Sequence, residues 1–100
     1  MALVIRASTF CETRVLKVES WGVTHVDACL IGGRRTFGFG EIECILMSVK
    51  HVLSFQVGDE VFSVATKPGN RRHQKTIEAL VDAVRAAHGL PPGGRFFGVV

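Results

Sequence analysis

Apolar and polar residues alternate along most of the first two thirds of the chain, which is the pattern of β-strands with one buried face. In residues 13–19, Leu16 and Val18 alternate with more polar neighbours. A turn is expected at residues 19–22, and a second strand over residues 23–31 with its even positions on the apolar face. The same pattern predicts five more strands, over residues 2–7, 34–40, 41–47, 51–57 and 60–66.

Two glycine-containing pairs predict how neighbouring strands are joined. A two-residue hairpin turn at Gly32-Gly33 would fix the register of the strands on either side. Under that register Phe37 faces Ala28. Phe39 then faces Val26, and both aromatic rings lie on the apolar side of the hairpin.

The same glycine-rich segment has a second interpretation. Gly33 and Gly38 have the G-x-x-x-x-G spacing of a phosphate-binding loop, but Phe39 stands where that motif has its lysine. The residues that follow are typical of a strand, so no helix N-terminus is expected to hold a phosphate there. The sequence therefore favours the hairpin.

A second hairpin is predicted at Gly58-Asp59. A two-residue turn at this position places Phe55 opposite Phe62. It also places Leu53 opposite Val64, which gives two apolar cross-strand pairs on one side of the hairpin.

The hydrophobic period changes after the last predicted strand. Residues 67–70 interrupt the sheet, and Asn70 is suited to cap a helix that begins at Arg71. The helix would end at Gly89, which is followed by two prolines, and residues 90–100 are expected to be an irregular tail or linker. The apolar stripe of the predicted helix consists of Ile77, Leu80, Val81, Val84 and the Ala87/His88 pair.

Seven strands joined by tight turns and one C-terminal helix predict a mainly β (α+β) domain, built as a curved sheet or partly open barrel with a helical lid. The segment FGFGEIECILMSVKHVLSFQVGDEVFSVATKPGNRRHQKTIEALVDAV resembles bacterial members of the pleckstrin-homology-like superfamily. The resemblance covers about residues 13–88 and lies in the order of elements, with no catalytic signature. It implies a pleckstrin-homology-like domain over residues 1–89, with two near-orthogonal antiparallel sheets of about seven strands and a capping helix.

That resemblance implies a binding module for proteins, peptides or phosphoinositide headgroups. Lipid-binding members of the superfamily hold the headgroup with a lysine and a following basic-x-Arg pair on the first two strands. Arg6 and Arg14 occupy the corresponding strands here, but Leu16 replaces the arginine of the pair and Glu12 adds an opposing charge.

Composition is that of one globular domain, with 47% hydrophobic and 21% charged residues. The net charge of +3 permits an anionic partner without identifying one, and no nucleic acid is expected because the phenylalanines fall on core positions. Arg6 interrupts the apolar start of the chain, and no apolar stretch is long enough to span a membrane, so we expect a cytoplasmic protein. The odd number of cysteines predicts reduced core residues, at Cys11, Cys29 and Cys44.

Basic residues form the candidate ligand sites. If the turns at residues 8–12, 32–33 and 58–59 share one end of the barrel, four arginines approach one rim and form a candidate anion site; they are Arg6, Arg14, Arg34 and Arg35. A secondary basic group, composed of Arg71, Arg72, His73 and Lys75, lies in the first turns of the predicted helix. For both groups, solvated surface charge is the alternative interpretation.

No metal and no cofactor are expected. His25, Asp27 and Cys29 share one face of a predicted strand, but a structural zinc site needs four ligands and no second clustered pair is present in the sequence. The serines lie outside any G-x-S-x-G elbow, and no cysteine adjoins a histidine at a helix N-terminus. We therefore expect a protein that is not an enzyme.

The remaining candidate for a functional site is an interaction surface on the predicted sheet. The second faces of strands 41–47 and 60–66 are predicted to carry Ile45, Met47, Val61 and Ala65. Partly apolar faces of this kind suit a partner strand or an oligomer interface. The expected function is protein–protein or self-association through sheet faces or edges, and the alternative is binding of an anionic-lipid headgroup at the basic rim.

Overall fold

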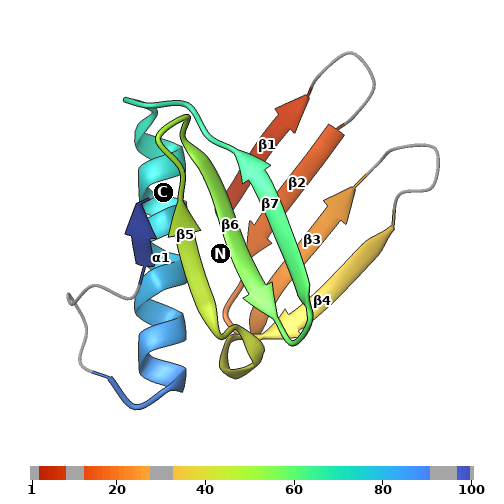
Figure 1. Ribbon diagram of the computed structural model, residues 1–100, viewed down its shortest axis with the longest axis vertical. Helices are drawn as coiled ribbons and strands as arrows, with labels where there is room; N and C mark the ends of the chain where they lie inside the picture. The colour runs from red at the N-terminus through yellow and green to blue at the C-terminus, as the bar shows by residue number, and fades with distance from the viewer. Residues whose placement is uncertain (1–2, 9–12, 28–32, 91–96, 100) are drawn as a thin grey trace.

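The computed structural model describes residues 3–8, 13–27, 33–90 and 97–99 (Figure 1). Its elements, in chain order, are β1 (Leu3–Ser8), β2 (Thr13–Val18), β3 (Gly22–Asp27), β4 (Arg34–Gly38), the 3₁₀ helix η1 (Phe39–Glu41), β5 (Cys44–Met47), β6 (Val52–Val57), β7 (Glu60–Ala65), α1 (Arg71–Ala87) and β8 (Phe97–Val99).

Two sheets face each other, and the helix packs along one side of them (Figure 1). The first sheet has the order β1-β2-β3-β4 and is antiparallel throughout. The second contains the antiparallel strands β7-β6-β5, and β8 extends it by pairing parallel to β5. The mainly antiparallel β architecture with a C-terminal helix is as predicted, but no ladder in the described part of the chain joins the two sheets into a closed barrel.

The core lies between the sheets and under α1. It is composed of Ile5, Leu16, Val18, Val23 and Phe37 from the first sheet, Ile42, Ile45, Leu53, Phe55 and Val64 from the second sheet and the segment before it, and Leu80, Val81 and Val84 from α1. The ring of Phe55 stacks on the half-buried ring of Phe62, with centroids 5.5 Å apart, and meets the ring of Phe37 edge-on at 5.9 Å. Such aromatic contacts add stability beyond the area they bury.

The second hairpin has the predicted register. Phe55 pairs with Phe62, and Leu53 pairs with Val64. Gly58 has a φ of +59°, as the first central residue of a type II′ turn requires, and this conformation suits glycine.

The first hairpin does not have the predicted register. Phe37 pairs with Val23, five residues away from Ala28 along the chain, and the ladder ends where Asp27 donates its N–H to the carbonyl of Gly33. Residues 28–32 lie outside the described part, but the connection is longer than a two-residue turn at Gly32-Gly33. The register follows the burial of Val23 against Phe37 in the core, and a tight turn would have broken that pair.

The faces of β3 and the strand state of Phe39 also differ from the prediction. The odd positions of β3, Val23 and His25, lie on the core face, whereas the even face had been expected to be the apolar one. Phe39 lies in η1 rather than in a strand, and it packs against the core from there.

The helix follows its predicted pattern closely. The Oδ1 of Asn70 accepts hydrogen bonds from the N–H groups of Arg72 and His73, at 3.0 and 3.1 Å. Gly89 has a φ of +74° directly after the C-terminal turn. Two positions differ from the predicted stripe. Arg85 is buried although the stripe excludes it, and the Ala87/His88 pair, predicted at the end of the stripe, is exposed.

The C-terminal tail, expected to be irregular, contains a strand. Residues 97–99 form β8, whose ladder with β5 pairs Leu46 with Gly98. β8 therefore occupies the edge of the second sheet opposite β7.

Candidate functional site

A cavity of about 330 Å³ lies where the ends of β2, β3 and β4 approach β7. Strands β2, β3 and β4 contribute polar side chains from the ends of their core-facing sides, beyond the apolar core. Its polar lining consists of Arg14, His25, Asp27, Arg35 and Ser63.

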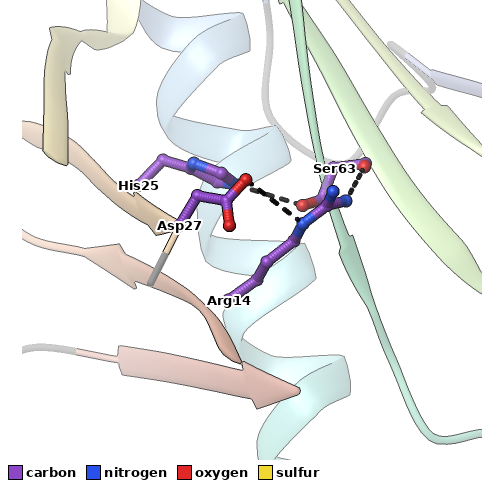
Figure 2. A network of polar contacts seen from close by, with 4 residues as sticks. All are labelled: Arg14, His25, Asp27 and Ser63. Carbon is purple, nitrogen blue, oxygen red and sulfur yellow. Dashed lines mark hydrogen bonds and ion pairs between the residues drawn. The ribbon is translucent and has the colours of Figure 1, made fainter. Parts of the chain in front are cut away.

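Arg14 connects the two sheets. It lies opposite Asp27 in the β2–β3 ladder, and its Nε is 3.6 Å from the Asp27 Oδ2. Its Nη1 donates a hydrogen bond of 2.8 Å to the Oγ of Ser63 on β7 (Figure 2). Both side chains of the ion pair are about one third exposed, so the pair orients the guanidinium more than it stabilises the fold.

His25 makes the second connection between the sheets. Its side chain is only 4% exposed, and its Nε2 lies 3.0 Å from the backbone carbonyl of Ser63 (Figure 2). A carbonyl oxygen only accepts, so Nε2 carries a proton and donates it. The ring also packs against Phe62, with centroids 5.2 Å apart.

The Ser63 carbonyl lies on the free edge of β7. Val57 and Glu60 close the two-residue turn as a hydrogen-bonded pair, and such pairs alternate along an antiparallel ladder. Ser63 is three residues beyond Glu60, so its backbone groups point away from β6. The imidazole of His25 satisfies a carbonyl that the second sheet leaves unpaired.

These contacts differ from a serine–histidine–aspartate relay. In that relay the histidine bonds the serine hydroxyl and the aspartate bonds the histidine. Here His25 bonds the carbonyl of Ser63, the hydroxyl of Ser63 accepts from Arg14, and Asp27 pairs with Arg14. The arrangement joins two sheets.

Arg35 forms a third connection, at the mouth of the cavity. Its Nη1 and Nη2 donate to the two carboxylate oxygens of Glu60, at 3.0 and 2.8 Å. The guanidinium also lies 5.7 Å from the ring centroid of Phe62 and 5.8 Å from that of Phe37. The bidentate geometry fixes the beginning of β4 to the beginning of β7.

The four arginines of the predicted rim are not brought together. Arg14 and Arg35 line this cavity, where carboxylates compensate both charges. Arg6 lines a different cavity, and Arg34 lies on the opposite face of β4 from Arg35 and is exposed.

The residues of the predicted secondary basic group also differ from one another in exposure. Arg71, Arg72 and Lys75 are exposed on the first turns of α1, whereas His73 is buried. Of the metal trio, His25 and Asp27 share one face of β3, and Cys29 lies outside the described residues. The part of the chain that the structure describes contains no cluster of three side chains suited to a metal ion.

A second cavity, of about 400 Å³, lies between the end of β1, the end of β7 and the start of α1. Arg6, Lys67 and His73 line it. The Nδ1 of His73 accepts a hydrogen bond of 3.0 Å from the backbone N–H of Lys67. Burial of the ring, and then the nearby charge of Lys67, lower the pKa of His73.

The outer face of the second sheet, meaning the side of β5, β6 and β7 turned away from the core, is the third surface of interest. It consists of Cys44, Leu46, Val52, Ser54, Gln56, Val61, Ser63 and Ala65. Val61 is 67% and Leu46 37% exposed, and a hollow of about 40 Å³ lies between them.

The predictions for this face are confirmed in part. Val61 and Ala65 are exposed, as expected. Ile45 and Met47 instead point to the core, because the alternation in β5 places Cys44 and Leu46 outside. Cys44 is a free, half-buried thiol and not a core residue; the other two cysteines lie outside the described residues.

Comparisons with known proteins give no relative for this chain. No protein-family model, no curated protein and no solved structure matches it. In the described residues, no helix is both long enough and apolar enough to cross a membrane.

Sequence reasoning missed the roles of Glu60 and Ser63. Neither residue belongs to a motif, and both reach the first sheet only through tertiary packing. The burial of His25 had a usable signal, because it lies two residues from Val23 and therefore on the same face of the strand.

Proposed function

We propose that this chain is a non-catalytic interaction module that associates with a second copy of itself through the outer face of the second sheet. The observation that carries the proposal is the exposure of Leu46 and Val61 on a face that no described element covers (Figure 1). The opposite face of the same sheet packs on the core, so the uncovered side is the one available to a partner.

The charge distribution supports a second copy as the occupant. All eight described residues of the outer face are uncharged, on a chain of net charge +3. Two copies related by a two-fold axis would place the same apolar patch against itself without opposing like charges. A strongly charged partner would gain nothing from this face.

The pleckstrin-homology-like classification is part of this proposal. Two mainly antiparallel sheets and the helix that follows β7 support it, and so does the order of elements along the sequence. The non-catalytic assignment is supported by the use of Arg14, His25 and Ser63 in contacts between the sheets. The alternative, an anionic-lipid headgroup at a rim of Arg6, Arg14, Arg34 and Arg35, has less support because these arginines are dispersed.

Sedimentation velocity across a concentration series tests the proposal. We expect the weight-average sedimentation coefficient of the wild-type protein to increase with concentration, because self-association follows mass action. Val61→Lys and Leu46→Lys place a charge on the outer face and should abolish the increase. Val4→Lys is the matched control, because Val4 is an exposed valine of the first sheet.

Two results would contradict the proposal. The first is a wild-type protein that sediments as a monomer at every concentration. The second is a concentration dependence that persists in Val61→Lys and Leu46→Lys while circular dichroism shows that both variants are folded.

A further inference from the structure

The cavity between β1, β7 and α1 has a lining that the self-association proposal does not use. Arg6 enters it from β1, Lys67 from the segment that follows β7, and His73 from the first turns of α1. Three elements distant in sequence thus bring basic side chains to one hollow of about 400 Å³.

Among the described residues, the charge of this cavity is uncompensated, in contrast to the cavity at Arg14. In that part of the chain no carboxylate lines it, and neither Arg6 nor Lys67 forms an ion pair. In the other cavity, Arg14 pairs with Asp27 and Arg35 with Glu60. The local potential therefore favours an anion at Arg6 and Lys67.

His73 provides an independent observation that points to a ligand. The side chain is 9% exposed, and its Nδ1 accepts the N–H of Lys67, so the ring is neutral and its proton is on Nε2. That Nε2–H has no hydrogen-bond acceptor among the described residues. The Nε2 atom is not fully enclosed by protein, and His73 lines the cavity, so an anion bound there would supply the acceptor.

The cavity wall is held in place before any ligand binds. The Lys67 N–H is fixed by His73, and the Lys67 carbonyl accepts the N–H of Asn70, the residue that caps α1. Thr66 donates both its N–H and its hydroxyl to the carbonyl of His51. The backbone of this wall would need little further ordering on binding, which favours affinity.

We propose that this cavity binds a phosphate group, held by the guanidinium of Arg6, the ammonium of Lys67 and the Nε2–H of His73. Arginine and lysine are the side chains that phosphate oxygens bind most strongly, and a phosphate dianion matches two cations and one neutral donor. The cavity volume lies in the range of small-ligand sites, with room for a phosphate and part of the group that carries it. Ala65 borders both this cavity and the outer face of the second sheet, but Arg6, Lys67 and His73 do not belong to that face, so either proposal can fail without the other.

Titration with inorganic phosphate, followed by NMR of the histidine side chains and matched in ionic strength with sodium chloride, tests the proposal. We expect a saturable shift of the His73 imidazole signals that chloride does not produce. Arg6→Gln and Lys67→Gln should each weaken phosphate binding by about tenfold, because each removes a charge-assisted hydrogen bond. Lys17→Gln, which removes a cation of β2 that lines neither cavity, should leave the affinity unchanged.

A second set of probes identifies the source of the phosphate. Saturable binding of glycerol 3-phosphate, without co-sedimentation on phosphatidylcholine vesicles containing phosphatidic acid, would support the site with a soluble ligand. Arg6-dependent co-sedimentation with those vesicles, and not with pure phosphatidylcholine, would support it with a lipid headgroup. A shift that fails to saturate, or equal affinities in Arg6→Gln, Lys67→Gln and wild type, would overturn the proposal.

Discussion

Replacing Gly22 by alanine tests the register of the first hairpin. Gly22 begins β3 and lies opposite Gly38 in the ladder with β4. A Cβ built on Gly22 overlaps the carbonyl oxygen of Phe37, and it lies 3.1 Å from the Phe37 carbonyl carbon and 3.2 Å from the Cα of Gly38. All three atoms belong to the backbone, so no side-chain rotation relieves the overlap.

The size of the effect follows from what must move. The strands have to separate at the Gly22–Gly38 pair, and overpacking of this kind costs about 1–3 kcal/mol. Each backbone hydrogen bond that is lost with the pair adds about 0.5–1.5 kcal/mol. The lower entropy of alanine in the unfolded chain returns about 0.4–1 kcal/mol. The expected net loss of about 2–4 kcal/mol is a large part of the roughly 5–15 kcal/mol that stabilises a typical domain.

Urea unfolding of wild type, Gly22→Ala and Gly40→Ala measures this loss. Gly40 is an appropriate control because it is exposed in η1 and no atom lies within 4 Å of a Cβ built there. Its substitution should change the free energy of unfolding by less than about 1 kcal/mol. If Gly22→Ala were as stable as Gly40→Ala, Gly22 would not face Gly38, and the register described here would be wrong.

Two further changes test the start of α1. Asn70→Ala removes the acceptor of two helix N–H groups and should lower the free energy of unfolding by about 1 kcal/mol in the same urea assay. Asn70→Asp keeps an acceptor and should lose little stability. Equal losses in the two variants would exclude a capping role. The pKa of His73 in the folded protein is below its ordinary value of 6.5, so the unfolded chain takes up the proton first as the pH falls. The stability that the neutral ring contributes is therefore present above pH 6.5. It is lost as the pH falls from 6.5 toward the folded-state pKa. Unfolding measured on both sides of pH 6.5 should show this loss in wild type and a smaller one in His73→Gln, and equal losses in the two proteins would contradict it.

Local signals were sufficient where turn chemistry and burial favoured the same structure. At Gly58-Asp59 the two-residue turn and the apolar pairs agree, and the register is as predicted. At the helix, Asn70 and Gly89 mark the ends of an apolar stripe that the core indeed buries. Each of these elements is specified within a few consecutive residues.

The first hairpin could not be predicted in this way. The pair Gly32-Gly33 satisfied a local rule, but Phe37 packs against Phe55 and Phe62, which belong to the other sheet. Contacts between residues this far apart in the sequence set the register, and no pattern within the hairpin records them. The same limit explains why Ile45 and Met47 of β5 were assigned to the outer face, although both point to the core.

The candidate sites show a similar division. The sequence identified Arg14 and Arg35 as residues of interest, yet the structure uses both to join the sheets through Ser63 and Glu60. Arg6 could not be connected with Lys67 and His73 in advance, because only the packing of β1 beside β7 and α1 brings them together.

The contact between His25 and Ser63 has a consequence for how copies of this chain can assemble. The last strand of a sheet offers its free backbone groups to any passing segment, and open-ended fibrils grow in this way. At the middle of β7 the imidazole already occupies the carbonyl that an incoming strand would need. Strand addition to β7 is blocked at that point, which is compatible with the proposed stacking of one outer face on another.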